Sequence, residues 1–221
     1  MTRNKIIHGN AIEELDRLET ESVDLIVTDP PYLVNYTDRA GRSVANDGNA
    51  EGVLPAFDGM YRVLKHNSLC ISFAGWTALD GFTSAWASAG FRIVGHIVWT
   101  KDYASSRGQT AYHHESAYVL AKGWPKKPLE PLADVQDWVY SGNRLHPTEK
   151  SVENIAALIR TYSRPGEIVL DPFLGSGTTA VAAVLNGRDY IGIELDRAYC
   201  DLAERRVSGA LRYRNGQNRA A

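Results

Sequence analysis

The chain has 221 residues and is poor in cysteine, in net charge and in long apolar runs, and each shortage excludes a class of protein. Its two cysteines, Cys70 and Cys200, are too few for a disulfide framework or a cysteine-rich metal site, and they suit a reducing cytoplasm. No apolar run approaches the ~20 residues of a membrane span, and we expect no signal peptide. With a net charge of −2, any contact with nucleic acid has to be local rather than driven by bulk charge.

The apolar fraction is an ordinary 44%, in segments that alternate between the periods of strands and helices, which excludes a disordered chain. This alternation predicts an α/β fold with a mostly parallel sheet and helices on both faces, in a single domain over residues 1–221. The expected strands are 5–8, 23–28, 69–74, 91–100, 115–121, 167–170 and 190–193, and the expected helices cover 12–18, 53–64, 79–86, 152–159 and 180–185.

Several stretches lack this pattern. Residues 33–51 hold too little apolar material to pack, so we expect a mobile loop there. The stretch 122–147 contains four prolines and is expected to be short and irregular, and 101–114 is expected to be a loop. Residues 205–219 carry arginines without a single acid, which fits either a solvated tail or contacts to phosphate. These arginines are Arg205, Arg206, Arg212, Arg214 and Arg219.

A glycine turn follows the expected strand 167–170. Gly175 and Gly177 accept the positive φ of a sharp strand-to-helix turn and let a ligand approach the backbone. The free N–H groups at the start of the next helix favour a carboxylate or phosphate, and Glu194 after the next strand can accept hydrogen bonds from both hydroxyls of a ribose. A turn without ligand and a dinucleotide site both stay open. The carboxylate of Asp171 favours S-adenosylmethionine, because it opposes a pyrophosphate and attracts a sulfonium or ammonium group.

The expected strand 23–28 ends in Asp-Pro-Pro-Tyr, at the carboxyl edge of the sheet. A surface turn is the plain alternative. However, two prolines fix the backbone between a carboxylate and an aromatic ring, and they bring no N–H groups that would compete for the carboxylate. We therefore predict a site for a planar base with an exocyclic amine. Asp29 and the carbonyl of Pro30 would accept the amine hydrogens, while Tyr32 stacks on the ring.

Such a site suits methyl transfer to the amine. An exocyclic amine is a poor nucleophile, because its lone pair is delocalised into the ring. Two acceptors localise the lone pair toward a methyl donor, and the positive charge that develops on the amine lies beside Asp29. No general base with a raised pKa is required, since the proton can leave after the transfer. A base inside a duplex cannot reach this pocket, so it has to be flipped out or already unpaired.

Together, the motifs at 29–32 and 171–179 resemble those of the β-class amino DNA methyltransferases (N6-adenine/N4-cytosine), in which the catalytic motif precedes the cofactor motif. Residues 192–196 and 146–150 are similar to further family motifs, and the likeness spans nearly the whole chain. It implies a Rossmann-like class I methyltransferase fold in permuted order, with S-adenosyl-L-methionine as cofactor. The residues that it assigns to catalysis are Asp29, Pro30, Pro31 and Tyr32. Those that it assigns to the cofactor are Asn10, Asp29, His146, Thr148, Lys150, Asp171, Phe173, Gly175, Ser176, Gly177, Thr178, Thr179, Glu194 and Asp196.

The chain also departs from this family. Asn10 stands where the family has an Asp against the cofactor adenine, and Ser151 stands where it has a proline. The stretch 122–147 is short for a target-recognition region, which implies loose sequence specificity or help from elsewhere. His113, His114 and Glu115 are interpreted as a polar edge rather than a metal site, because neighbours on a strand point to opposite faces.

The resulting hypothesis is a cytoplasmic DNA methyltransferase that acts on adenine N6, because an Asp at the head of the catalytic motif tilts toward adenine within the family. N4-cytosine methylation is the first alternative. An NAD-binding dehydrogenase would leave residues 29–32 unexplained, and a catalytically silent DNA-binding module would not need an intact catalytic motif. The expected partner is DNA, as a duplex with a flipped base or as a single strand. The resemblance leaves a homodimer open and suggests restriction–modification as a setting.

Overall fold

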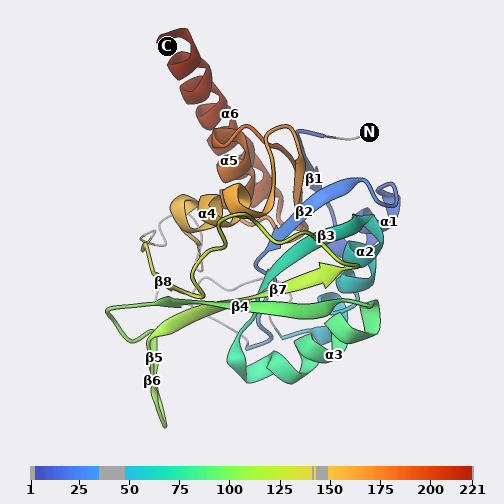
Figure 1. The fold of residues 1–221 in the computed structure, drawn as a ribbon, viewed down its shortest axis with the longest axis vertical. Helices are drawn as coiled ribbons and strands as arrows, with labels where there is room; N and C mark the ends of the chain where they lie inside the picture. Colours follow the sequence, from blue (N-terminus) through green and yellow to red (C-terminus); the bar gives the residue numbers. More distant parts are fainter. Residues whose placement is uncertain (1–2, 35–47, 141, 143–148, 221) are drawn as a thin grey trace.

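The computed structural model describes residues 3–34, 48–140, 142 and 149–220, with the backbone alone for 218–220. Within these residues, eight strands form one sheet in the order β1-β10-β9-β2-β3-β7-β4-β8, and β5 and β6 form a separate hairpin (Figure 1). Neighbouring strands are parallel except at β7, which is antiparallel to β3 and β4. The strands are β1 (Lys5–His8), β2 (Val23–Thr28), β3 (Leu64–Phe73), β4 (Arg92–Thr100), β5 (Ser106–Arg107), β6 (Ala111–Tyr112), β7 (His114–Lys122), β8 (Val135–Asp137), β9 (Ile168–Asp171) and β10 (Asp189–Glu194).

Two neighbouring inner strands, β2 and β9, carry the two sequence motifs. Both strands are largely apolar and buried, as expected for inner strands of a parallel sheet that is covered on each face. They pair with each other, with Ile26 opposite Leu170. Their carboxyl ends, Thr28 and Asp171, therefore reach the same edge of the sheet.

Helices cover both faces of the sheet, and this confirms the predicted α/β architecture. Helices α1, α2 and α3 pack in one apolar cluster with Ile26, and α4, α5 and α6 pack in another with Leu25 and Val27. This division follows from β2 itself, because successive residues of a strand point to opposite faces. The helices are α1 (Ala11–Arg17), α2 (Ala56–Val63), α3 (Leu79–Ala89), α4 (Val152–Tyr162), α5 (Thr178–Leu185) and α6 (Arg197–Ala220), with short 3-10 turns η1 (Ala50–Gly52) and η2 (Trp76–Ala78).

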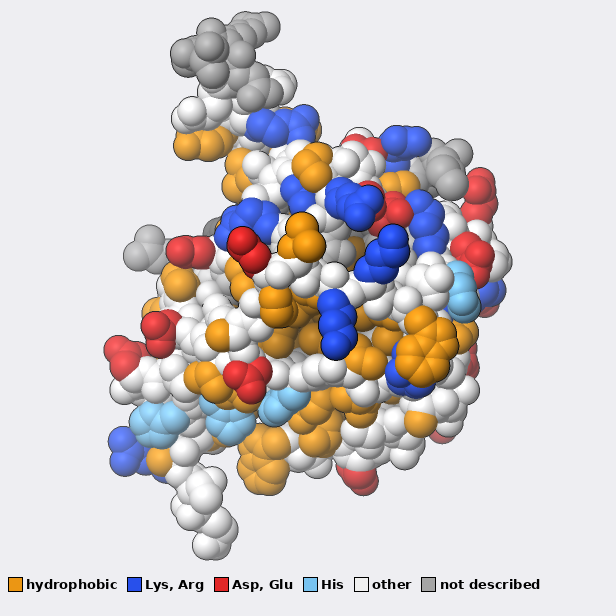
Figure 2. All heavy atoms as spheres, viewed as in Figure 1, with side chains coloured by type: hydrophobic (Ala, Val, Ile, Leu, Met, Phe, Trp, Pro, Cys, Tyr) orange, Lys and Arg blue, Asp and Glu red, His pale blue; other side chains and the backbone are white. Residues whose placement is uncertain are grey.

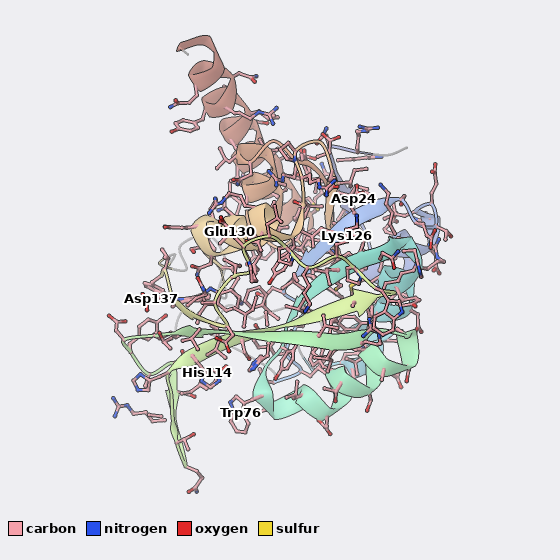
Figure 3. The ribbon with its side chains drawn as sticks, in the orientation of Figure 1. Asp24, Trp76, His114, Lys126, Glu130 and Asp137 are labelled. Carbon is pink, nitrogen blue, oxygen red and sulfur yellow. The ribbon has the colours of Figure 1, made fainter. Side chains whose placement is uncertain are left out.

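The carboxyl edge of the sheet also holds the start of β7 and the ends of β4 and β8, because β7 runs against β4 while β8 runs with it. Figure 3 shows His114 and Asp137 toward the end from which the β5–β6 hairpin projects, and Asp24, near the start of β2, away from them. The catalytic motif at 29–32 therefore lies at the same edge as this hairpin.

Helix α6 is the main element that the sequence analysis did not predict. Apolar side chains on α6 are buried against the body at intervals of three and four residues, and the helix then leaves the body toward the C-terminus (Figure 1). On the face shown in Figure 2, Lys and Arg side chains gather around the place where this helix leaves. The buried residues that define its inner side are Cys200, Ala203, Val207 and Ala210.

Smaller differences concern strand ends and short strands. β3 begins at Leu64, five residues earlier than expected and directly after the last residue of α2. The stretch 101–114 contains the β5–β6 hairpin, and 122–147 contains β8, which pairs with the edge strand β4. Both are too short and polar to show an apolar period. Most of the predicted mobile loop, 35–47, lies outside the described residues. Of the helices described, none has the unbroken apolar length that spanning a bilayer requires.

Candidate active site

A cavity of about 310 Å³ lies at the carboxyl edge of β2 and β9 and joins the two motifs. All four residues of the Asp-Pro-Pro-Tyr motif line it, so the catalytic and cofactor motifs do share one cleft. Gly177 is not among the lining residues, and His146 and Thr148 lie outside the described part of the chain. The predicted cofactor residues that line the cavity are Asn10, Asp29, Lys150, Asp171, Phe173, Gly175, Ser176, Thr178, Thr179, Glu194 and Asp196.

The carboxylate of Asp29 is engaged on both oxygens. The Tyr32 hydroxyl donates to Oδ1 at 2.8 Å, and Lys150 Nζ donates to Oδ2 at 2.6 Å. Burial raises the pKa of Asp29, and the ammonium of Lys150 opposes this rise. Burial also raises the pKa of Tyr32, as does the charge of Asp29, so the Tyr32 hydroxyl stays protonated and donates.

Asp171 ties the two motif strands together at their carboxyl ends. Its Oδ1 accepts from Thr28 Oγ1 at 3.0 Å and from the backbone N–H of Phe173 at 3.1 Å, and its Oδ2 accepts from Thr179 Oγ1 at 2.7 Å. The side chain is buried, and burial raises the pKa of Asp171 to about 7. Neutral donors thus hold Asp171 in place without a compensating cation among these contacts.

The glycine turn is shaped by positive φ and by Glu194. Gly175 and Gly177 have φ of 54° and 90°, and a Cβ on Gly177 would lie 2.7 Å from that of Ala203 on α6. Glu194 Oε2 accepts from the N–H of Gly175 at 2.7 Å, and its Oε1 accepts from the N–H of Asp196 at 2.8 Å. Burial raises the pKa of Glu194, and these two N–H groups counter the rise. Gly177 therefore serves close helix packing, while Glu194 ties the glycine turn to the segment that follows β10.

Asn10 caps α1 on another wall of the cavity. Its Oδ1 accepts from the N–H of Ile12 at 2.9 Å, as expected for an asparagine at a helix start. One lone pair of this oxygen and the side-chain NH₂ group are not used by that bond. Asn10 can therefore both cap the helix and offer polar atoms to the cavity.

Arg206, which the sequence analysis considered only as a tail or phosphate contact, braces the pocket from α6. Its Nη1 donates to the carbonyl and hydroxyl oxygens of Ser176 at 2.8 and 2.7 Å, and Nη2 lies 3.0 Å from Glu149 Oε1. The brace thus joins the glycine turn to the residue that precedes Lys150. The three- and four-residue spacing of apolar residues on α6 was the signal that could have placed Arg206 on a helix.

A second buried ion pair lies near the catalytic motif. Lys101 at the end of β4 pairs with Glu115 on β7, and the charge of Glu115 raises the pKa of Asp29 and of Tyr32. The Lys101 ammonium also lies 5.4 Å from the ring centre of Trp138. Glu115 is thus an ion-pair partner rather than part of a histidine cluster. The described residues contain no group of three or more His, Cys, Asp or Glu that could hold a metal ion.

The sheet order, the glycine turn and the catalytic motif on one cavity define a class I methyltransferase, with the catalytic motif first in the chain. A sequence profile of the family N6_N4_Mtase, described as DNA methylase, matches residues 23–205. The chain therefore belongs to the N6/N4 DNA methylase family, whose members use S-adenosylmethionine. The family, fold class and cofactor predicted from the sequence are confirmed, and the chain is a DNA methyltransferase.

Two relatives from Escherichia coli (strain K12) match over almost the whole chain. The methylase candidate YubD is 48% identical over 95% of this chain and 92% of its own length. The DNA adenine methyltransferase YhdJ is 30% identical over 94% of this chain and 84% of its own length.

Solved structures show the same fold. The complex of M1.HpyAVI with S-adenosylmethionine has a TM-score of 0.71 at 25% identity, over 92% of this chain and 98% of that chain. The PvuII DNA methyltransferase, which is cytosine-N4-specific, has a TM-score of 0.74 at 16% identity, over 93% of this chain and 86% of that chain. The fold is therefore shared with a complex of S-adenosylmethionine and with a cytosine-N4-specific enzyme.

Proposed function

We propose that this chain transfers a methyl group from S-adenosyl-L-methionine to the exocyclic N6 of adenine in a flipped or unpaired base of DNA. The observation that carries the proposal is the single cavity lined by Asp29–Tyr32 on one side and by the glycine turn and Glu194 on the other. A methyl donor held by one wall would then meet an amine held by the other.

The residues present fit the cofactor. Each oxygen of Glu194 uses one lone pair on a backbone N–H and keeps another for a ribose hydroxyl. The polar atoms of Asn10 suit an adenine edge, and the carboxylate of Asp171 suits the ammonium at the methionine end. When bound, S-adenosylmethionine supplies an electrophilic methyl group on a sulfonium.

Asp29, Pro30 and Tyr32 act on the target base. Asp29 and the carbonyl of Pro30 accept the two amine hydrogens, which localises the lone pair of the nitrogen. As the new N–C bond forms, the C–S bond of the sulfonium would break and leave a neutral thioether. The carboxylate would stabilise the positive charge on nitrogen, and the proton would leave to solvent afterwards. Tyr32 holds Asp29 through its hydroxyl and offers its ring face to the base, so the stacking and positioning roles belong to one side chain.

Adenine is favoured over cytosine by two observations. The catalytic motif begins with Asp29, which within the family tilts toward adenine. YhdJ, named a DNA adenine methyltransferase, is 30% identical over most of the chain. N4-cytosine methylation is the second candidate, because the cytosine-N4-specific PvuII enzyme shares the fold.

We expect DNA to be contacted by local basic groups, here the exposed arginines of α6. Arg205 and Arg212 lie exposed on α6, whereas Arg206 and Arg214 are used in hydrogen bonds to the body. The side chain of Arg219 lies outside the described part.

Both cysteines are free, which suits the predicted cytoplasmic location. The homodimer and the relaxed specificity expected from the short stretch 122–147 stay predictions.

Mass spectrometry of nucleosides tests this function. DNA incubated with the protein and S-adenosylmethionine is digested, and the methylated nucleosides are measured. The expected product is N6-methyladenosine in its deoxy form, with none from a matched Asp29→Asn variant. N4-methylcytosine as the main product would overturn the adenine assignment, and equal product from the variant would overturn the role of Asp29.

A further inference from the structure

Lys150 contacts the catalytic carboxylate, whereas the family resemblance assigns it to the cofactor. Its Nζ lies 2.6 Å from Asp29 Oδ2, and the side chains are 8% and 21% exposed. Among the described residues, Asp29 is the one carboxylate within ion-pair distance of Lys150. The contact joins two segments that are 121 residues apart in the chain.

The backbone around Lys150 is held on both sides. Glu149 is fixed by Arg206 at 3.0 Å, and Ser151 caps α4 by accepting from the N–H of Asn154 at 3.2 Å. The ammonium itself lies 5.0 Å from the ring centre of Phe73 and 5.4 Å from that of Tyr32, within reach of a cation–π attraction. These contacts place the charge beside Asp29.

We propose that Lys150 is a positioning residue for the target side of the site, which keeps Asp29 ionised and fixes the direction of its carboxylate before the base arrives. The inference rests on the proposed function, in which Asp29 accepts a hydrogen of the target amine. Lys150 does not have to leave for this, because each carboxylate oxygen has a second lone pair.

The charges around Asp29 require such a partner. Burial is the largest cause that raises the pKa of Asp29, and the negative charge of Glu115 on β7 raises it too. Asp171 on β9 is a second carboxyl group that interacts with the charge of Asp29. Lys150 and the Tyr32 hydroxyl are the groups that favour the ionised form. A protonated Asp29 would offer no negative charge to the amine, so removal of the Lys150 charge should cost activity most at low pH.

An NMR titration tests this without any turnover. The protein is labelled with 13C at the aspartate carboxylates, and the Asp29 resonance is assigned by its loss in Asp29→Asn. We expect Asp29 to titrate at a higher pH in Lys150→Met than in the wild type, and close to the wild type in Lys150→Arg. Equal titration of Asp29 in the wild type and in Lys150→Met would overturn the proposal. Lys150→Gln serves if the Met variant does not fold.

The matched control is Lys65→Met. Lys65 on β3 pairs at 2.5 Å with Asp24, which lies near the start of β2, at the other end of that strand from Asp29 and away from the cavity. Like Lys150→Met, this variant removes a lysine–aspartate pair, here with a lysine that is 40% rather than 8% exposed, and we expect it to leave the titration of Asp29 unchanged. A shift of Asp29 in Lys65→Met as large as in Lys150→Met would mean that the effect is general, which contradicts the proposal.

Single-turnover rates at saturating cofactor measure how Lys150 affects the methyl-transfer step. We compare the ratio of the rate at about pH 8 to the rate at about pH 6. This ratio should be about tenfold larger in Lys150→Met than in the wild type. A residue that only binds the cofactor would instead raise the cofactor KM and leave the pH profile in place, and that result would overturn the proposal. If the wild type methylates no DNA, the proposed function fails, while the titration still decides whether Lys150 holds Asp29 ionised.

Discussion

The two walls of the cavity hold their carboxylates in different ways. On the cofactor wall, Asp171 and Glu194 accept hydrogen bonds from hydroxyls and backbone N–H groups. On the target wall, Asp29 is held by the ammonium of Lys150 and by the Tyr32 hydroxyl. The difference indicates that turns and strand ends position the carboxylates of the cofactor wall. The carboxylate of the target wall depends instead on the charge of Lys150, which lies far from Asp29 in the sequence. Variants on the two walls should therefore fail in different ways.

The largest expected effect lies on the target wall. Asp29→Ala removes the acceptor beside the developing positive charge, so we expect methyl transfer to fall by about a hundredfold or more. Affinity for S-adenosylmethionine should stay largely intact, because the cofactor wall is unchanged. A methylation assay and calorimetry measure the two effects. Near-wild-type turnover in this variant would contradict the mechanism.

The brace between the walls should matter next. Arg206→Ala removes the ion pair with the buried Glu149 and the hydrogen bonds to Ser176, and we expect a loss of about 3 kcal/mol in the free energy of unfolding. Denaturant unfolding measures this loss. Arg212→Ala is the matched control on the exposed side of α6, with an expected change near zero. Equal losses in the two variants would show that Arg206 makes no special contribution.

A smaller effect is expected on the cofactor wall. Glu194→Ala should weaken the binding of S-adenosylmethionine by about 1.5–3 kcal/mol, the range for hydrogen bonds to a charged group. It also frees the N–H groups of Gly175 and Asp196. Calorimetry measures the affinity, with Glu204→Ala on the exposed side of α6 as the control. An unchanged affinity would move the ribose contact to another residue.

The smallest effect concerns pH and stability. The pKa of Asp171 is raised by burial from 3.8 to about 7, so the folded protein binds a proton that the unfolded chain releases across this range. This group stabilises the fold at low pH, and its contribution declines as pH rises from about 4 to 7. In Asp171→Asn, we expect a smaller decline in the free energy of unfolding over this range. Equal declines in urea unfolding would contradict the raised pKa.

Local patterns made much of this predictable. The apolar runs of β2 and β9 show as strands because both faces are buried, and the turns at their ends are marked by Pro and Gly. The shared edge followed from parallel pairing. Asp29 and Glu194 could also be predicted from the sequence, because Asp29 directly follows β2 and Glu194 is the last residue of β10.

Long-range contacts were not predictable in the same way. No local pattern in the sequence pairs Lys150 with Asp29 or Arg206 with Glu149, because each pair joins segments far apart in the chain. The arginines of α6 also obscured its helical period, although its apolar residues have helical spacing. The short strand β8 forms only because the edge of β4 is available to it.

The position of the transferable methyl group shows whether the cofactor wall and the target wall meet at Asp29. S-adenosylmethionine with a 13C-labelled methyl group is bound to the protein, and nuclear Overhauser effects from that methyl group are recorded. We expect contacts from the methyl protons to protons of Pro30, Pro31 or Tyr32. Contacts confined to residues outside this motif would separate the methyl donor from Asp29 and contradict this expectation.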